Sequence, residues 1–199
     1  MSQDGVNKAR RRFLIGSTSV VGAVGVGFVA VPFIQSWQPS ARAQAVGAPV
    51  EANINTIKPG QLVKFQWRGQ TIGVMRRTQA MLDRLAELDS RLKDPDSENS
   101  GQQPDYAKNA HRSQDPEILV LNMHCTHLGC VPQVLPQPGA YSWERDWPGG
   151  FYCPCHKSKF DLAGRVFKSV PAPSNLLVPP HSFLLNDTLL IGVDPEGAA

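Results

Sequence analysis

A long apolar segment without charge dominates the N-terminal part of the chain. No charged residue occurs from Phe13 to Ala41, and residues 13–34 are mostly apolar. About 20 such residues in a helix cross a hydrocarbon layer of roughly 30 Å. The segment also exceeds the apolar stretch of an ordinary cleaved signal, which is about 7–15 residues long. The pattern predicts a retained transmembrane anchor over residues 13–37, and small residues at 41–45 leave cleavage open as the alternative.

Short strand-like runs follow in the second part of the chain. Residues 61–67 and 70–76 lie on either side of Arg68-Gly69, which predicts a hairpin of two strands. Residues 117–123 predict a further strand. A final hairpin is expected from residues 183–185 and 188–193, which lie on either side of Asn186-Asp187.

One segment has the period of a helix instead. Between residues 77 and 93, apolar side chains recur on one helical face, and Asp94-Pro95 ends the pattern. The side chains on this face are Met81, Leu82, Leu85, Leu88 and Leu92. We expect the face to pack against its own domain rather than against a partner.

The remaining segments predict connections. Residues 38–49 are rich in Pro, Ala, Gly and Ser and carry one charge, which is typical of a flexible hinge linker. Residues 94–115 are polar and predict no regular element. The 17 Gly and 17 Pro of the chain favour a loop-rich β domain over a helical bundle. We therefore expect residues 50–199 to form a small antiparallel β head domain with one inserted helix.

Charge changes this picture mainly at the N-terminus. The 199 residues include 20 Lys and Arg and 17 Asp and Glu, and the net charge of +3 gives little support to a nucleic-acid role. Residues 1–12 nevertheless contain Lys8 and Arg10-Arg11-Arg12. Because basic residues precede the apolar span and few follow it, the N-terminus is expected in the cytoplasm and the head on the other side.

The basic run also resembles a twin-arginine export signal. Arg10-Arg11-Arg12 is followed directly by Phe13-Leu14. Such signals export proteins that fold, often around a cofactor, before they cross the membrane. The alternative is that the arginines only flank a membrane helix. Within the helix, Ser19, Ala23 and Gly27 recur every four residues, a spacing that favours close packing of another helix.

The chemistry of the chain is concentrated in two loops. All four Cys lie in the segments CTHLGC and CPCHKS. Cys125 with His127, and Cys153 with His156, offer two thiolates and two imidazoles. This set suits a tetrahedral zinc site, or a two-iron cluster in which two His replace two Cys on one iron. A zinc site with four ligands has no use for an additional Cys in each loop, which favours the cluster.

The paired motifs CTHLGC and CPCH resemble the cluster-binding loops of the Rieske iron–sulfur family, in particular its members in bacterial ubiquinol–cytochrome c reductase. The similarity includes the export-type anchor, the hinge-like linker, DLAGRV and the proline-rich stretch from Pro171, and so covers nearly the whole chain. It implies a mainly β fold class. The expected architecture is a Rieske-type antiparallel β head domain with an inserted helix, plus one N-terminal transmembrane helix. The cluster-binding part is expected at about 117–182.

The resemblance implies one Rieske-type [2Fe-2S] cluster. Cys125 and Cys153 would ligate the buried iron through sulfur, and His127 and His156 the outer iron through nitrogen. The family's pattern places further roles on other positions. These are a disulfide between Cys130 and Cys155, a hydroxyl of Ser158 that donates to a bridging sulfide, a covering third loop at 170–173, and an exposed tip at Leu128 that docks into the quinol pocket of cytochrome b.

Three residues depart from the family's pattern. Phe160 stands where many members have Tyr, and the lost hydroxyl donor is expected to lower the reduction potential. Lys157 replaces an expected Gly, so that a positive φ there would be less readily adopted, while its charge would favour the reduced cluster. His124 stands where an apolar residue is expected, and we interpret it as structural. His111 and His181, far from both motifs, receive the same interpretation.

The implied function is electron transfer within a respiratory oxidoreductase. The chain is expected to accept an electron and a proton from quinol, with His127 and His156 as the acting residues, and to reduce a cytochrome c-type haem. It would not be catalytic alone. Its expected partners are cytochrome b and a cytochrome c-type subunit, in a dimeric complex of the bacterial inner membrane with the head in the periplasm. The alternatives are a structural zinc domain, the Rieske subunit of another exported oxidoreductase such as arsenite oxidase, and a soluble oxygenase-type ferredoxin.

Overall fold

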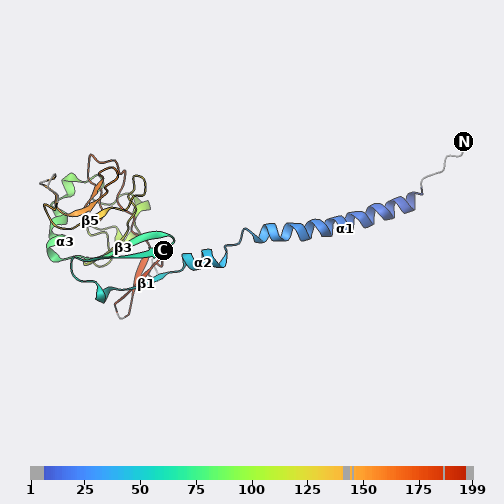
Figure 1. The fold of residues 1–199 in the computed structure, drawn as a ribbon, viewed down its shortest axis with the longest axis horizontal. Helices are drawn as coiled ribbons and strands as arrows, with labels where there is room; N and C mark the ends of the chain where they lie inside the picture. Colours follow the sequence, from blue (N-terminus) through green and yellow to red (C-terminus); the bar gives the residue numbers. More distant parts are fainter. Residues whose placement is uncertain (1–6, 141–143, 145, 186, 196–199) are drawn as a thin grey trace. The chain divides into compact units, whose positions relative to one another are not determined.

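The computed structural model describes residues 7–140, 144, 146–185 and 187–195. The chain divides into two compact units, residues 1–45 and residues 46–199, and each is described by itself. Figure 1 shows both units with colours that follow the sequence.

The N-terminal unit consists mainly of one long helix. Helix α1 (Lys8–Gln35) begins after Asn7, whose side chain accepts hydrogen bonds from the backbone N–H groups of Ala9 and Arg10, both at 3.1 Å. It is the one helix of the described residues that is long and apolar enough to cross a membrane, with a mean hydropathy of 2.0. Within the predicted linker lies a short helix, α2 (Ala41–Gly47), so part of that segment is regular. Its Ala-rich sequence favours a helix over an irregular chain.

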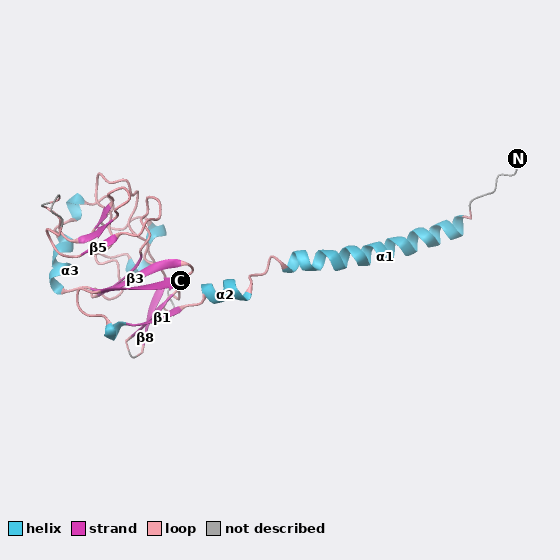
Figure 2. Ribbon diagram, viewed as in Figure 1, coloured by secondary structure: helices cyan, strands magenta, loops and turns pink. Residues whose placement is uncertain are grey.

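Within the described residues, the strands of the head form three antiparallel sheets of three strands each. Figure 2 draws the strands in magenta. The first sheet has the order β1 (Val50–Asn53), β9 (Thr188–Ile191) and β8 (His181–Leu184). The second has the order β2 (Leu62–Trp67), β3 (Gln70–Arg76) and β4 (Ile118–Asn122). The third has the order β5 (Gln133–Leu135), β6 (Gly150–Tyr152) and β7 (Lys159–Phe160). The predicted antiparallel β class is confirmed.

The middle sheet forms because its strands meet the requirements of a tight hairpin. At the turn between β2 and β3, Arg68 and Gly69 have φ angles of 51° and 72°. A two-residue hairpin turn of the favoured kind needs positive φ at both positions. Strand β4 then pairs with β3, with Val74 opposite Val120. The predicted strands at 61–67, 70–76 and 117–123 are confirmed to within one residue at each end.

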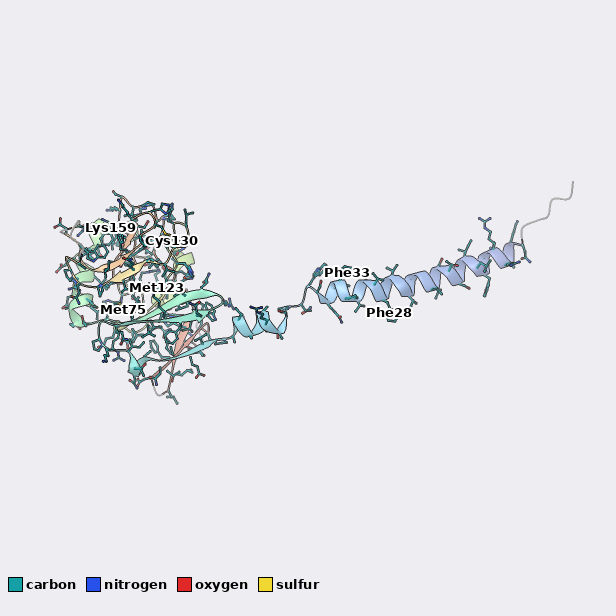
Figure 3. The ribbon with its side chains drawn as sticks, viewed as in Figure 1. Phe28, Phe33, Met75, Met123, Cys130 and Lys159 are labelled. Atoms are coloured by element: carbon teal, nitrogen blue, oxygen red, sulfur yellow. A yellow bond between two sulfur atoms is a disulfide. The ribbon has the colours of Figure 1, made fainter. Side chains whose placement is uncertain are left out.

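Alternation along β3 and β4 buries both faces of the middle sheet. Ile72, Val74, Ile118 and Val120 belong to a core shared with the first sheet. The intervening side chains face the other way, into a core shared with the third sheet and the two Cys- and His-bearing loops. They are Met75, Leu119, Leu121 and Met123, of which Met75 and Met123 are labelled in Figure 3. The middle sheet therefore packs against the two Cys- and His-bearing loops.

The inserted helix is shorter than predicted. Helix α3 (Gln79–Ala86) ends seven residues before Lys93, and a 3₁₀ turn follows at Asp89–Arg91. All members of the apolar face are buried, which confirms that it packs on its own domain. The prediction of one helix over 77–93 is wrong, because the backbone at the end of this range pairs with a distant segment instead of continuing the helix. Leu92 forms a bridge with Phe167, and the N–H of Lys93 donates to the carbonyl of Val166.

The polar segment 94–115 contains two 3₁₀ turns, Ser100–Gln102 and Asp105–Ala107, and a further 3₁₀ turn at Ile54–Thr56 follows β1. The segment is not a solvated loop, because Gln103 and Arg112 are buried. The predicted final hairpin is found between β8 and β9, and its strand bounds differ from the predicted ones by up to two residues. Asn186 of its predicted turn lies outside the described residues.

Candidate metal centre

Two loops with the same backbone hydrogen bonds carry the Cys and His side chains. The first follows β4, and the second joins β6 to β7. In the first loop, the N–H of Cys125 donates to Cys130 and the N–H of Gly129 donates to Cys125, both at 2.8 Å. In the second, the N–H of Cys153 donates to Ser158 at 2.8 Å and that of Lys157 to Cys153 at 2.9 Å. The spacing is identical, so each loop closes on its own first Cys.

A disulfide joins these loops. It links Cys130 to Cys155, whose Cα atoms are 6.6 Å apart (Cys130 is labelled in Figure 3). The Sγ of Cys153 lies within 4.8 Å of both disulfide sulfurs. Because those two sulfurs bind each other, they are not available to a metal. The disulfide instead holds the free thiols and the two loop tips in one place.

The two remaining thiols lie side by side in the core. Cys125 and Cys153 are free, with exposed fractions of 2% and 1%. Burial raises the pKa of the Cys125 thiol, and the adjacent Cys153 raises it further. Phe151 and Phe160 belong to the same apolar core. Two thiolates in such surroundings require a positive partner, and a metal ion supplies it.

Two imidazoles complete the donor set at the surface. The rings of His127 and His156 have centroids 4.6 Å apart and meet edge to face. The Nδ1 of His127 is buried, and the described residues offer it no hydrogen-bond partner. His156 is exposed and His127 half-buried. An inward nitrogen without a partner is what a metal-ligating histidine presents, so two sulfurs and two nitrogens fit a Cys₂His₂ cluster site.

A third segment, residues 170–174, is hydrogen-bonded to the two loops. The segment was predicted from the sequence, but not all of its contacts were. The fully buried Ser158 accepts a hydrogen bond at its Oγ from the N–H of Ala172, at 3.0 Å. The hydroxyl of Thr126 donates to the carbonyl of Ser174 at 2.7 Å. Lys93 donates to the carbonyls of Val170 and Ala172 at 2.8 and 2.6 Å. The sequence carried no signal for Lys93, which comes from the segment after α3.

The other residues named in the sequence analysis do not belong to the donor set. Leu128 is 71% exposed at the tip of the first loop. The Nδ1 of His124 lies 2.7 Å from the Oδ1 of Asn122, so this ring has a local hydrogen-bond partner. His181 is buried against Tyr106, and burial lowers its pKa. His111 is half-buried.

Lys157 occupies the position in the second loop that Gly129 has in the first. Its φ is 61°, against 83° for Gly129. A side chain in this region costs about 1–2 kcal/mol, so Lys157→Gly is expected to raise the free energy of unfolding by about 1 kcal/mol. Denaturant unfolding of the two proteins measures the difference. In the control, Lys64→Gly within strand β2 should lower stability by about 0.5–1 kcal/mol. A loss of stability in both variants would contradict strain at Lys157.

Comparison with known proteins identifies the family of the chain. Residues 1–40 match the family model "Ubiquitinol-cytochrome C reductase Fe-S subunit TAT signal", and residues 99–181 match "Rieske [2Fe-2S] domain". The ubiquinol-cytochrome c reductase iron-sulfur subunit of Allochromatium vinosum is 55% identical over 198 residues, covering 100% of this chain and 95% of that protein. The subunit of the same name from Blastochloris viridis is 39% identical and covers 96% of this chain and 97% of its own.

Among solved structures, one titled "Hyperthermophilic respiratory Complex III" has a TM-score of 0.49 at 24% identity and covers 90% of this chain and 98% of its own. The sequence relatives are far more similar than this structure, and they carry the assignment. The matches favour the [2Fe-2S] cluster over the zinc alternative. The chain belongs to the family of Rieske iron–sulfur subunits of ubiquinol–cytochrome c reductase.

Proposed function

We propose that this chain accepts one electron and one proton from quinol at the quinol-oxidation site of cytochrome b. It passes the electron to a cytochrome c-type haem and so supports proton translocation. Cys125 and Cys153 would hold one iron of the cluster, and His127 and His156 would hold the other. When bound, the cluster supplies a one-electron centre with a potential in the range of roughly −150 to +300 mV, because neutral imidazoles replace two thiolates.

One observation carries this proposal: two loops joined by a disulfide bring together two free buried thiols and two imidazoles whose rings are in contact. The Nδ1 of His127 is buried, so the other ring nitrogen, Nε2, lies on the outer side of the ring. Exposed His156 offers its outer nitrogen in the same region. These nitrogens accept the hydrogen bond of a quinol hydroxyl and hold its proton. Leu128 places an apolar side chain beside them, which excludes water from the contact.

The proposed arrangement in the membrane follows the two units of the chain. Residues 1–12 lie in the cytoplasm, residues 13–37 cross the inner membrane, and residues 38–49 connect the anchor to the periplasmic head, residues 50–199. The basic residues before α1, its apolar length and the export-signal match support this arrangement. The partners are cytochrome b and a cytochrome c-type subunit in a dimeric complex. Motion of the head on its linker lets the cluster approach first cytochrome b and then the cytochrome c-type subunit.

Leu128→Ala tests the proposed docking tip. The variant is expected to lower quinol–cytochrome c reductase activity about tenfold, because an apolar anchor in a docked pocket contributes about 1–2 kcal/mol. Its Rieske electron paramagnetic resonance (EPR) amplitude in the assembled complex should not change, since Leu128 is not a ligand. Both quantities are measured on the same membranes.

Leu185→Ala is the matched control. Leu185 is 89% exposed and follows β8 in the first sheet, whereas Leu128 belongs to the first cluster loop. Its replacement removes the same side chain from a different surface, and activity should stay at the level of the unchanged protein. Equal activities of the two variants would contradict docking through Leu128.

A further inference from the structure

Among the described residues of the head, three arginines are buried outside the metal centre. Arg77, Arg112 and Arg165 have exposed fractions of 2%, 0% and 1%. Asp161, at 0%, is the only acid among the described residues that is buried. Burying guanidinium groups is costly unless hydrogen bonds and opposite charges compensate them. The burial of three guanidinium groups in one place therefore needs a structural or functional explanation.

All three arginines bind one turn, residues 161–165. Arg77 donates to the carbonyl of Leu162 at 3.0 Å, and Arg112 donates to the carbonyl of Ala163 at 3.2 Å. The Nε of Arg165 donates to Asp161 at 2.7 Å. Arg77 comes directly after β3, Arg112 from the polar segment 94–115, and Arg165 from the turn itself. We call these three arginines with Asp161 the arginine clamp.

The clamped turn connects the second and third loops of the metal centre. It follows β7 directly, and the second loop lies between β6 and β7. The N–H of Leu176 donates to the carbonyl of Gly164 at 2.8 Å, and the N–H of Val166 donates to the Oδ1 of Asn175 at 2.8 Å. These bonds tie the turn to the end of the covering segment. A Cβ on Gly164 would lie 3.2 Å from the Nη1 of Arg112, so the guanidinium rests directly against the backbone of the turn.

The turn also shares its interior with the metal centre. Leu162 and Ala163 belong to the same apolar core as the two free thiols, Cys125 and Cys153. A charge held against the turn therefore acts on the metal centre through a medium of low dielectric, where its effect is weakly screened.

The buried groups of the clamp are three guanidinium cations and one carboxylate, and the other acids around them are half-buried or exposed. The carboxylate of Asp161 pairs with Arg165, whose Nη1 also lies 2.8 Å from Asp89, a side chain that is 54% exposed. Asp94 and Asp115 face Arg112 and Arg77, from half-buried and exposed positions. The other hydrogen bonds of Arg77 and Arg112 go to neutral oxygens. Burial lowers the pKa of both to about 10, which leaves them charged at neutral pH.

We propose that the arginine clamp positions the second and third cluster loops and, through its excess positive charge, raises the reduction potential of the cluster. Reduction adds one negative charge to the metal centre, and buried cations stabilise it. The arginines act through the turn and the electric field, so they are positioning residues. This inference rests on the ligand assignment proposed above.

Two variants with opposite charge changes test the clamp. Each full-length protein, loaded with its cluster in detergent, is titrated electrochemically and followed by EPR. At a fixed ambient potential, Arg112→Gln should shift the ratio of reduced to oxidised cluster severalfold toward the oxidised form. Asp161→Asn should shift it severalfold toward the reduced form. Both should lower the melting temperature, since both remove buried hydrogen bonds. Unchanged potentials, or shifts in the same direction, would indicate packing alone and overturn the electrostatic role.

A milder pair of variants decides the question if the buried ones do not fold. Asp89→Asn removes the half-exposed acid beside Arg165 and should shift the ratio toward the reduced form with little loss of stability. Glu51→Gln, in β1, makes the same change of net charge on an exposed position of the first sheet and should shift nothing. Equal potentials in these two proteins would overturn the inference alone. Absence of a Rieske signal in the unchanged protein would overturn the ligand assignment together with it.

Discussion

Cys153→Ala is expected to abolish the iron–sulfur centre. Cys153 is one of only two free thiols, and no other described sulfur can replace it, because the disulfide occupies Cys130 and Cys155. Without that thiolate the core offers iron a single sulfur, and neutral nitrogens do not compensate the lost negative charge. The purified variant should lack iron, visible colour and the EPR signal. Iron analysis and EPR of the same sample measure this.

The control for this prediction removes the other two sulfurs. The double variant Cys130→Ala/Cys155→Ala keeps all four proposed ligands, and it should still bind iron and give a Rieske signal when prepared at low temperature. A Cys153→Ala protein with the same iron content and signal as the unchanged chain would contradict the ligand assignment.

Removal of the disulfide should have the second large effect, on stability. The bond closes a loop with a sequence separation of 25 residues, and the chain-entropy relation gives about 3.5 kcal/mol for a loop of that length. Cys130→Ser/Cys155→Ser is therefore expected to lower the free energy of unfolding by about 3.5 kcal/mol. The two loops are then free to separate, so the cluster should also be lost at a lower temperature. Denaturant unfolding, followed by circular dichroism and by visible absorption, measures both changes.

A thiol reductant provides the control for the disulfide. Reductant should move the unchanged protein toward the stability of the double variant and leave the double variant unaffected. A difference below about 1 kcal/mol between the oxidised protein and the double variant would show that other contacts hold the loops together.

Features set by neighbouring residues could be predicted from the sequence. The apolar span, the Arg68-Gly69 hairpin and the spacing within each Cys- and His-bearing loop depend on local geometry, and each predicted element is present. The positive φ anticipated for a Gly at position 157 is present as well, although Lys157 occupies it. Local steric rules are strong enough to fix these features before tertiary packing is known.

Features that depend on distant pairing could not be predicted. Strand β1 pairs with β9, more than a hundred residues later in the chain, and β7 has only two residues, too few for any periodic signal. The early end of α3 follows from bonds to residues 166–168 rather than from a stop signal. Arg77, Arg112 and Arg165 look like surface charges in the sequence, and only the fold buries them. Tertiary context overrides local preference at each of these places.

Low-temperature EPR of dithionite-reduced membranes that contain this protein tests the central claim most directly. Spectra are recorded with and without an inhibitor that occupies the quinol-oxidation site. A Cys₂His₂-ligated cluster whose histidines contact that site through their outer nitrogens predicts a rhombic Rieske signal that changes shape when the inhibitor binds. A metal-loaded protein without the Rieske signal, or a signal indifferent to the inhibitor, would contradict the account.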